Sequence, residues 1–182
     1  FDRVRDKNGW GRRALVSALT MLELDESEAR YASYEDLATM IRHRFTAPKQ
    51  TLHELFGRIV FNVLSGNTDD HARNHAAFLD GRYLTLTPAY YICPQGRTGG
   101  EATQAMLITG NKRFSRLTLC LEAAPQFHLS AERARAIITA QLSEIRAQWP
   151  QVCDEAGLSE VDRAFLWGRQ FLNPFALEGW SE

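Results

Sequence analysis

A long apolar helix pattern, ended by a glycine and followed by a polar loop, restricts the fold of this chain more than any other feature. Between Leu52 and Leu64, apolar residues recur at spacings of three and four, which is typical of a helix buried on a broad face. Thr51 and Glu54 match the capping-box pattern at its start. Ser65-Gly66-Asn67 supplies a stop signal. The sequence therefore predicts one central buried helix that ends where the polar stretch begins.

A tight hairpin is predicted after the polar stretch, because short apolar runs at 75–79 and 82–86 flank Asp80-Gly81, a pair typical of a type I′ turn. Further helices are predicted near the N-terminus and in the C-terminal third. Their ranges are 12–24, 34–44 with Ser33 and Asp36 as its cap, 131–149 between Ser130 and Pro150, and 160–171 after Ser159 with Asp162. The predicted fold class is mainly α (α+β), a helical domain with one small β-hairpin.

Composition agrees with a single globular domain. The chain has 182 residues, of which 45% are hydrophobic and 24% charged, and a net charge of −1. That charge argues against a nucleic-acid binder that relies on a general basic field, although it leaves room for a local basic patch. Three widely spaced cysteines fit neither a disulfide framework nor a zinc site, which favours a reducing, cytosolic compartment. No apolar run approaches the roughly 20 residues of a membrane span.

The polar loop between helix and hairpin carries the residues with chemical potential. Asp69 and Asn74 have the spacing D-x-x-x-x-N of the catalytic loop of protein kinases. In that loop an Asp accepts the proton of the substrate hydroxyl, and an Asn holds Mg²⁺, which prefers oxygen ligands and needs few from the protein. A loop held between a buried helix and a hairpin can fix both groups in place.

Other interpretations of the same loop remain open from the sequence. Asp69 or Asp70 can bond local backbone amides in a plain polar turn. His71 and His75 have the spacing of a metal pair, but the ordinary interpretation is a loop organiser and a packed strand residue. Arg73 can neutralise phosphate charge or form an ion pair. The Gly96–Gly100 stretch is more typical of a mobile linker than of a phosphate cradle.

Three segments of the chain resemble a known family, the HipA-type kinases, which are the toxins of bacterial HipA–HipB modules. The resemblance is carried by FGRIVFNVLSGNTDDHARNHAAFL at residues 56–79, by LTLTPAYYICP at 84–94, and by the opening Phe1-Asp2-Arg3. It covers essentially the whole chain and is most specific at N-T-D-D-H-A-R-N.

The resemblance implies the C-terminal lobe of a serine/threonine kinase that transfers the γ-phosphate of ATP to a protein serine, with Mg²⁺. It also implies a bacterial cytoplasmic toxin of a type II toxin–antitoxin system, restrained by a HipB-like antitoxin. The implied substrates belong to the translation machinery, in the class of the aminoacyl-tRNA synthetases. No membrane and no direct nucleic-acid partner is implied.

Residue by residue, the resemblance assigns site roles by position. Asp69 matches the catalytic base, and Asn74 matches the Mg²⁺-binding, cofactor-contacting Asn. His71 matches a histidine inside the catalytic motif. Phe1 and Asp2 match the edge of the adenine-binding hinge. These roles follow from the family motif.

The chain departs from the family at one metal position. The family has an Asp in a P-A-Y-D segment that binds Mg²⁺, whereas this chain has Tyr91 there, within Pro88-Ala89-Tyr90-Tyr91-Ile92. A phenol is neutral at pH 7 and a poor Mg²⁺ ligand. A metal ligand of this kind is worth about 3–4 kcal/mol of transition-state stabilisation.

The chain also shows no nucleotide-binding lysine on a predicted strand. Its three lysines, Lys7, Lys49 and Lys112, fall in polar connecting segments or turns. We therefore expect residues 1–182 to form one domain, a C-lobe whose N-lobe lies outside this chain. We also expect exposed apolar surface near Phe1 and Trp10, where such a lobe would lie.

Three functional hypotheses follow. The first is the C-lobe of an active HipA-type kinase, which would bind ATP weakly by itself. The second is a non-catalytic interaction module that binds a HipB-like antitoxin or a separate N-lobe, which Tyr91 favours. The third is a metal-dependent hydrolase built on Asp69, Asp70, His71 and His75.

Overall fold

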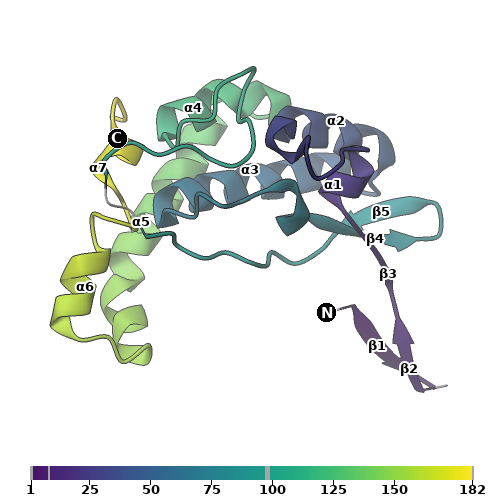
Figure 1. The fold of residues 1–182 in the computed structure, drawn as a ribbon, viewed down its shortest axis with the longest axis horizontal. Helices are drawn as coiled ribbons and strands as arrows, with labels where there is room; N and C mark the ends of the chain where they lie inside the picture. The colour runs from purple at the N-terminus through teal and green to yellow at the C-terminus, as the bar shows by residue number, and fades with distance from the viewer. Residues whose placement is uncertain (1, 8, 97–98, 182) are drawn as a thin grey trace.

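The computed structural model describes residues 2–7, 9–96 and 99–181, and it is mainly helical (Figure 1). The elements in chain order are β1 (Arg3–Asp6), β2 (Gly9–Arg12), β3 (Ala14–Ser17), α1 (Ala18–Met21), η1 (Ala29–Tyr31), α2 (Tyr34–Arg44), α3 (Pro48–Ser65), η2 (Ala72–Asn74), β4 (Ala76–Asp80), β5 (Tyr83–Leu86), α4 (Leu117–Ala123), η3 (Ala124–Phe127), α5 (Ala131–Glu155), α6 (Glu160–Leu166) and α7 (Pro174–Leu177). The predicted fold class, helical with small antiparallel sheets, is confirmed.

Helix α3 is the centre of the core, as its apolar spacing predicts. It contacts α2, α4, η3 and α5, so neighbours surround it on several sides. Each fully buried Leu, Ile, Val or Phe stabilises the fold by about 1.5–3 kcal/mol. The seven predicted core residues are each at most 1% exposed; they are Leu52, Leu55, Phe56, Ile59, Val60, Val63 and Leu64.

The two ends of α3 differ in how well the sequence predicts them. The helix ends at Ser65, and Gly66 adopts the left-handed conformation with φ 70°, as the stop signal indicates. The predicted capping box is wrong, because the helix already begins at Pro48 with Ala47 at the N-cap. Thr51 lies inside the first turns and donates from Oγ1 to the Ala47 carbonyl at 2.8 Å. Proline is well suited to the first helical position, which moves the start upstream.

A three-stranded antiparallel sheet in the order β3-β4-β5 flanks the polar loop. The β4–β5 hairpin confirms the Asp-Gly prediction, but its turn residues are Gly81 and Arg82, since Asp80 pairs with Tyr83. Only Gly81 of these two has a positive φ, 66°, so the turn is not type I′.

The predicted helix over 12–24 is wrong. Arg12 ends β2, residues 14–17 form β3 on the edge of β4, and only Ala18–Met21 is helical. Pairing with β4 is a tertiary contact that overrides the local pattern of this segment.

Helix α2 has the predicted bounds, with Ser33 as its cap accepting from the Asp36 backbone amide. In the C-terminal third, Ser130 and Ser159 cap α5 and α6 as predicted. The predicted ends are wrong: α5 continues through Pro150 to Glu155, and α6 ends at Leu166.

Aromatic side chains pack between the end of α5 and the chain after α6. Trp149 contacts Trp167 and Phe171 at ring-centroid distances of 4.9 and 5.0 Å. These contacts bring the chain after α6 back against α5 beside the proline.

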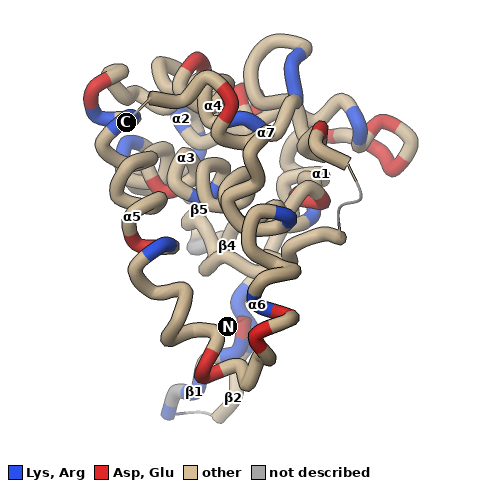
Figure 2. Tube along the Cα trace, turned by 90° about the vertical axis from the view of Figure 1, so that its left-hand side faces the viewer, with Lys and Arg blue, Asp and Glu red and all other residues tan. Residues whose placement is uncertain are grey.

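The β1–β2 hairpin extends away from the helical body (Figures 1 and 2). Its neighbourhood carries the exposed apolar side chains expected near the N-terminus, with Trp10 73% and Val4 47% exposed. The predicted residue Phe1 lies outside the described residues. Among the described residues, no helix has the length and apolar character needed to cross a bilayer.

Candidate active site

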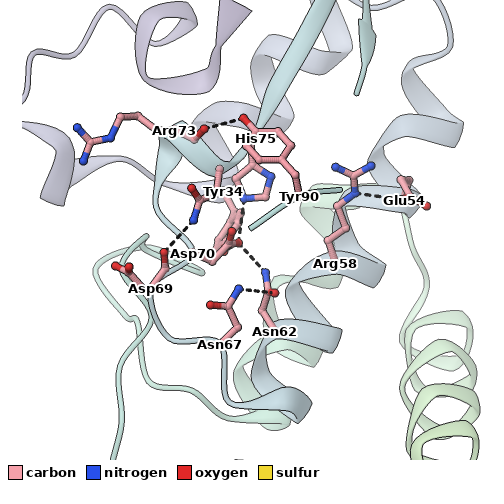
Figure 3. Close-up of polar contacts among 11 residues, drawn as sticks. Tyr34, Glu54, Arg58, Asn62, Asn67, Asp69, Asp70, Arg73, His75 and Tyr90 are labelled. Atoms are coloured by element: carbon pink, nitrogen blue, oxygen red, sulfur yellow. Dashed lines mark hydrogen bonds and ion pairs between the residues drawn. The ribbon is translucent and has the colours of Figure 1, made fainter. Parts of the chain in front are cut away.

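A buried carboxylate anchors the polar loop between α3 and β4. Asp70 is 3% exposed and accepts hydrogen bonds from Asn62 Nδ2 at 2.7 Å and from the Tyr34 hydroxyl. Its Oδ2 also lies 2.8 Å from His75 Nε2 (Figure 3). These partners come from α2, α3 and the start of β4, so one side chain ties three elements together.

The hydrogen bonds explain how a charge is tolerated in the core. Burial by itself would raise the pKa of Asp70, but His75 and the hydrogen bonds from His75 and Tyr34 outweigh burial and hold that pKa below its ordinary value. Burial, together with the neighbouring Asp70 charge, raises the pKa of Tyr34 well above its ordinary value, so the phenol stays a donor. Asp70 is therefore an ionised structural anchor, bonded to side chains and not to local backbone amides.

Asp69, the predicted base, lies next to this anchor and is exposed. Its carboxylate makes no hydrogen bond or ion pair with the described residues, so it is available to a ligand. Asn74, the predicted metal ligand, is 7% exposed and donates from Nδ2 to the backbone carbonyl of Asp69 at 3.0 Å. The structure therefore brings the two residues together, through the Asn74 amide and the Asp69 main chain.

The remaining loop residues take ordinary roles. The His71 carbonyl accepts from the Asn74 amide at 2.8 Å and closes the η2 turn, so the backbone of His71 shapes the loop. Arg73 pairs with Glu26, so it is the ion-paired alternative that the structure supports. His75 is 2% exposed and packs edge-on against Tyr34 besides bonding Asp70.

Hydrogen bonds hold the segment after β5 at Thr87 and at Tyr90, before and after Ala89. Arg58, 9% exposed on α3, donates to the Thr87 carbonyl at 2.8 Å and pairs with Glu54 at 2.9 Å. Tyr90 donates to the Arg73 carbonyl at 2.7 Å (Figure 3). The family-predicted metal position therefore follows directly on a segment tied to the loop.

Tyr91 occupies that position with an unusual backbone. Its φ is 57°, in the left-handed region that a bulky side chain rarely adopts, and its ring is 77% exposed. The ring contacts Tyr90 edge-on with centroids 6.5 Å apart. The Tyr91 side chain is therefore largely open to solvent.

The donor chemistry does not complete a magnesium site of the kinase type. The Asn74 Nδ2 donates to the Asp69 backbone carbonyl, so Asn74 has only its amide oxygen to offer a metal. Tyr91 offers a neutral phenol where the family has a carboxylate. Within residues 2–7, 9–96 and 99–181, no group of three or more His, Cys, Asp or Glu is placed to bind a metal. Since Asp70 and His75 bond each other in the core, the metal-dependent hydrolase hypothesis finds no support in this geometry.

Asp2 and the three lysines are the remaining residues considered for nucleotide binding. Asp2 is half-buried, and its backbone carbonyl accepts from the Arg13 amide at 2.7 Å, which joins the two ends of the β1–β2 hairpin. Lys7 and Lys49 are exposed, and Lys112 pairs with Glu122 at 2.7 Å. A small cavity at the loop is lined by Asn74, Asp70, His75 and Tyr90, but not by Asp69.

Sequence reasoning missed Tyr34, Asn62 and Arg58, which hold the loop and the segment after it. The available signal was the position of Asn62 and Arg58 within the most apolar helix of the chain. A polar residue on a buried helix is usually hydrogen-bonded, so it predicts a partner without identifying it.

One protein family and two solved structures are similar to this chain. A model of the HipA-like C-terminal domain matches residues 1–149. HipA of the Shewanella oneidensis MR-1 toxin–antitoxin system, solved with HipB and operator DNA, is similar with a TM-score of 0.70 and 19% identity over 91% of this chain and 44% of that chain. The Helicobacter pylori proinflammatory kinase CtkA is similar with a TM-score of 0.51 and 16% identity over 92% of this chain and 72% of that chain. A comparison with curated proteins found no match.

The solved structures show a shared fold at these identities, and this chain spans 44% of the length of the Shewanella HipA. The family model adds the sequence evidence, because it includes the loop with Asp69 and Asn74 and the segment with Tyr91. The helix, loop and hairpin arrangement and the matched residues agree. The chain belongs to the HipA-like C-terminal domain family.

Proposed function

We propose that this chain is the C-terminal lobe of a HipA-type serine/threonine protein kinase and that Asp69 is its catalytic base. In this role the Asp69 carboxylate accepts the proton of a substrate serine as the γ-phosphoryl group of ATP is transferred to the serine oxygen. The observation that carries the proposal is the exposed Asp69 carboxylate, which makes no hydrogen bond or ion pair with the described residues and lies beside a deeply anchored neighbour, Asp70. A rigid loop with one free carboxylate is what positioned proton transfer requires.

The proposal includes an N-lobe outside residues 1–182. A kinase needs a lysine on the ATP phosphates, and none of Lys7, Lys49 and Lys112 is placed for that role. The surface around the sheet supports the same view, since large apolar side chains are left open there. They are Leu15 and Leu79, each 44% exposed, and Tyr83, 52% exposed.

The proposed kinase role also implies a partner, a substrate class and a cellular compartment. A HipB-like antitoxin would restrain the intact protein, as the Shewanella HipA was solved together with HipB. The substrate would be a protein of the translation machinery, in the aminoacyl-tRNA synthetase class, in the bacterial cytoplasm.

A second candidate function rests on Tyr91. Without a carboxylate at this position the lobe lacks a ligand for the Mg²⁺ that accompanies ATP, so it would serve as a non-catalytic module that engages a HipB-like antitoxin or an N-lobe. The exposed ring and left-handed backbone of Tyr91 favour this candidate, because neither directs an oxygen toward Asn74.

The experiment joins residues 1–182 to the N-lobe of a HipA-type kinase and measures phosphate transfer from ATP to a protein serine by mass spectrometry. The proteins carry Tyr91 or Tyr91→Asp, each with and without Asp69→Asn. Where transfer occurs, Asp69→Asn should lower the rate by about 10²–10⁴-fold, the usual contribution of a general base. Glu144→Gln, on the exposed face of α5, is the control and should leave the rate unchanged.

Transfer in the Tyr91 protein supports the active kinase, and transfer only in the Tyr91→Asp protein supports the non-catalytic module. Transfer in neither protein, or a rate that does not depend on Asp69, would refute the kinase-lobe proposal.

A further inference from the structure

The β1–β2 hairpin presents an arginine-rich face with a tryptophan at its centre. In the antiparallel register Arg3 pairs with Arg12 and Arg5 pairs with Trp10. Directly opposite residues share a face of the ribbon, as do residues two apart on one strand. These four side chains therefore lie on one face, and all four are exposed, with Trp10 at 73%.

This face is electrostatically unfavourable for the isolated chain. Arg3 and Arg12 are like charges directly opposite each other, an arrangement that destabilises a strand pair. The guanidinium groups of Arg3, Arg5 and Arg12 form no hydrogen bond or ion pair with any described residue. Arg13, one position further along, instead stacks on the Phe78 ring at 3.5 Å. An anionic ligand on the hairpin face would remove the repulsion.

Positive charge is concentrated in this hairpin, although the whole chain is slightly negative. Residues 2–13 include five Lys or Arg and two Asp, whereas the whole chain has a net charge of −1. Figure 1 shows that the hairpin extends away from the helical body, and in Figure 2 it forms the lower tip of the molecule. A local basic patch of this kind attracts polyanions at short range, although the protein has no general basic field.

We propose that the face formed by Arg3, Arg5, Trp10 and Arg12 binds single-stranded nucleic acid. Arginine forks match phosphate oxygens in bidentate geometry. An exposed indole beside them offers a stacking surface for a base, and this pairing of cations with aromatic rings is how single strands are bound without sequence preference. An acidic peptide would use the arginines but leave the flat Trp10 ring without a stacking partner. The proposal revises the expectation of no direct nucleic-acid contact.

The size of the face sets the footprint and the salt dependence. Four residues of strand span about 13 Å, enough for a few nucleotides. Three phosphate contacts on a single strand predict that log K falls with log salt concentration with a slope of about −2. Binding should therefore be weak at physiological salt and clear at low salt.

The test measures fluorescence anisotropy of a labelled dT12 oligonucleotide with the complete chain at 20 to 200 mM NaCl. The triple variant Arg3→Gln, Arg5→Gln, Arg12→Gln should weaken binding at least tenfold, and it removes a repulsion, so the hairpin should still fold. Trp10→Ala should weaken binding roughly fivefold or more, whereas Trp10→Phe should retain most of it. The matched control replaces three exposed arginines elsewhere by glutamine, at Arg44, Arg82 and Arg133, and should bind like the parent.

Other outcomes would overturn the proposal. Polyglutamate competing as well as dT12 at equal charge, with no effect of Trp10→Ala, would assign the face to an acidic protein segment. Tighter binding to a 12-base-pair duplex than to dT12 would exclude the single-strand mode. Equal loss in the control variant would show only bulk charge attraction, and no binding at 20 mM NaCl would refute the site.

Discussion

At the scale of single residues, two adjacent aspartates with the same chemistry have opposite roles. Asp70 is 3% exposed and bonded to three side chains, whereas Asp69 is exposed and its carboxylate is unpaired among the described residues. Because both residues are aspartates, the residue type alone does not distinguish their roles. The family motif assigns Asp69 as the base, and the structure explains why its neighbour is needed to hold it in place.

Replacing Asp70 should destabilise the protein strongly. Asp70→Ala leaves the Tyr34 hydroxyl, the Asn62 amide and His75 without their shared acceptor, so we expect a loss of about 3–5 kcal/mol in the free energy of unfolding. Asp69→Ala, at an exposed position, should change it by no more than about 0.5 kcal/mol. Urea unfolding followed by circular dichroism measures both. Similar losses for the two variants would contradict the anchor role.

The same carboxylate predicts acid sensitivity. Because the folded-state pKa of Asp70 lies below its ordinary value of 3.8, its ionised form contributes stability that is complete above that value and is lost as pH falls through the folded-state pKa. Asp70→Asn removes this titration, so its stability should fall less steeply than that of the parent between pH 5 and pH 2.5. Unfolding midpoints in urea across this range test it. Parallel curves would show that Asp70 does not contribute.

At the scale of elements, the end of α3 is where three parts of the chain meet. The Gly66 carbonyl accepts from the Gln95 amide at 3.0 Å, and the Leu64 carbonyl accepts from the Leu172 amide at 2.8 Å. A Cβ at Gly66 would lie 2.5 Å from the Gln170 carbonyl oxygen. The close approach of the C-terminal turn thus fixes the point at which α3 ends and the polar loop begins.

Two glycines with similar backbones separate close packing from backbone preference. Gly66→Ala meets both a positive φ of 70° and the Gln170 backbone, whereas Gly81→Ala meets a positive φ of 66° with nothing within 4 Å. We expect Gly81→Ala to cost about 1–2 kcal/mol of stability, and Gly66→Ala at least about 1 kcal/mol more. Thermal unfolding of both variants checks the difference. Equal losses would mean that the Gln170 backbone shifts at little cost, so that close packing at Gly66 contributes little.

The elements also show what sequence can and cannot predict. The core face of α3, the cap of α2 at Ser33 and the β4–β5 hairpin follow from local periodicity and turn chemistry, and all are confirmed. The β3 strand and the passage of α5 through Pro150 depend on β4 and on the Trp167 and Phe171 rings, which are distant in sequence. The partners of Asp70 were missed for the same reason, since a buried polar residue predicts a partner but not which one.

At the scale of the whole molecule, the chain is a helical domain with exposed apolar side chains on its sheet and a basic hairpin at one end. The alignment with the Shewanella HipA includes 91% of this chain but only 44% of that HipA. We expect residues 1–182 by themselves to bind Mg·ATP no more tightly than the millimolar range, because neither a phosphate-binding lysine nor a carboxylate at position 91 is in place. Isothermal titration calorimetry tests this, and micromolar binding would contradict the one-lobe account.

We propose that a kinase catalytic loop is present here and that Tyr91 leaves its metal site incomplete. The most direct measurement is the rate of Mg²⁺-dependent phosphate transfer from ATP by the protein joined to an N-lobe, with Tyr91 or with Tyr91→Asp. Restoring the carboxylate should raise the rate by roughly 10²–10³-fold, the scale of one strong electrostatic contact in a transition state. Equal rates in the two proteins would contradict the claim.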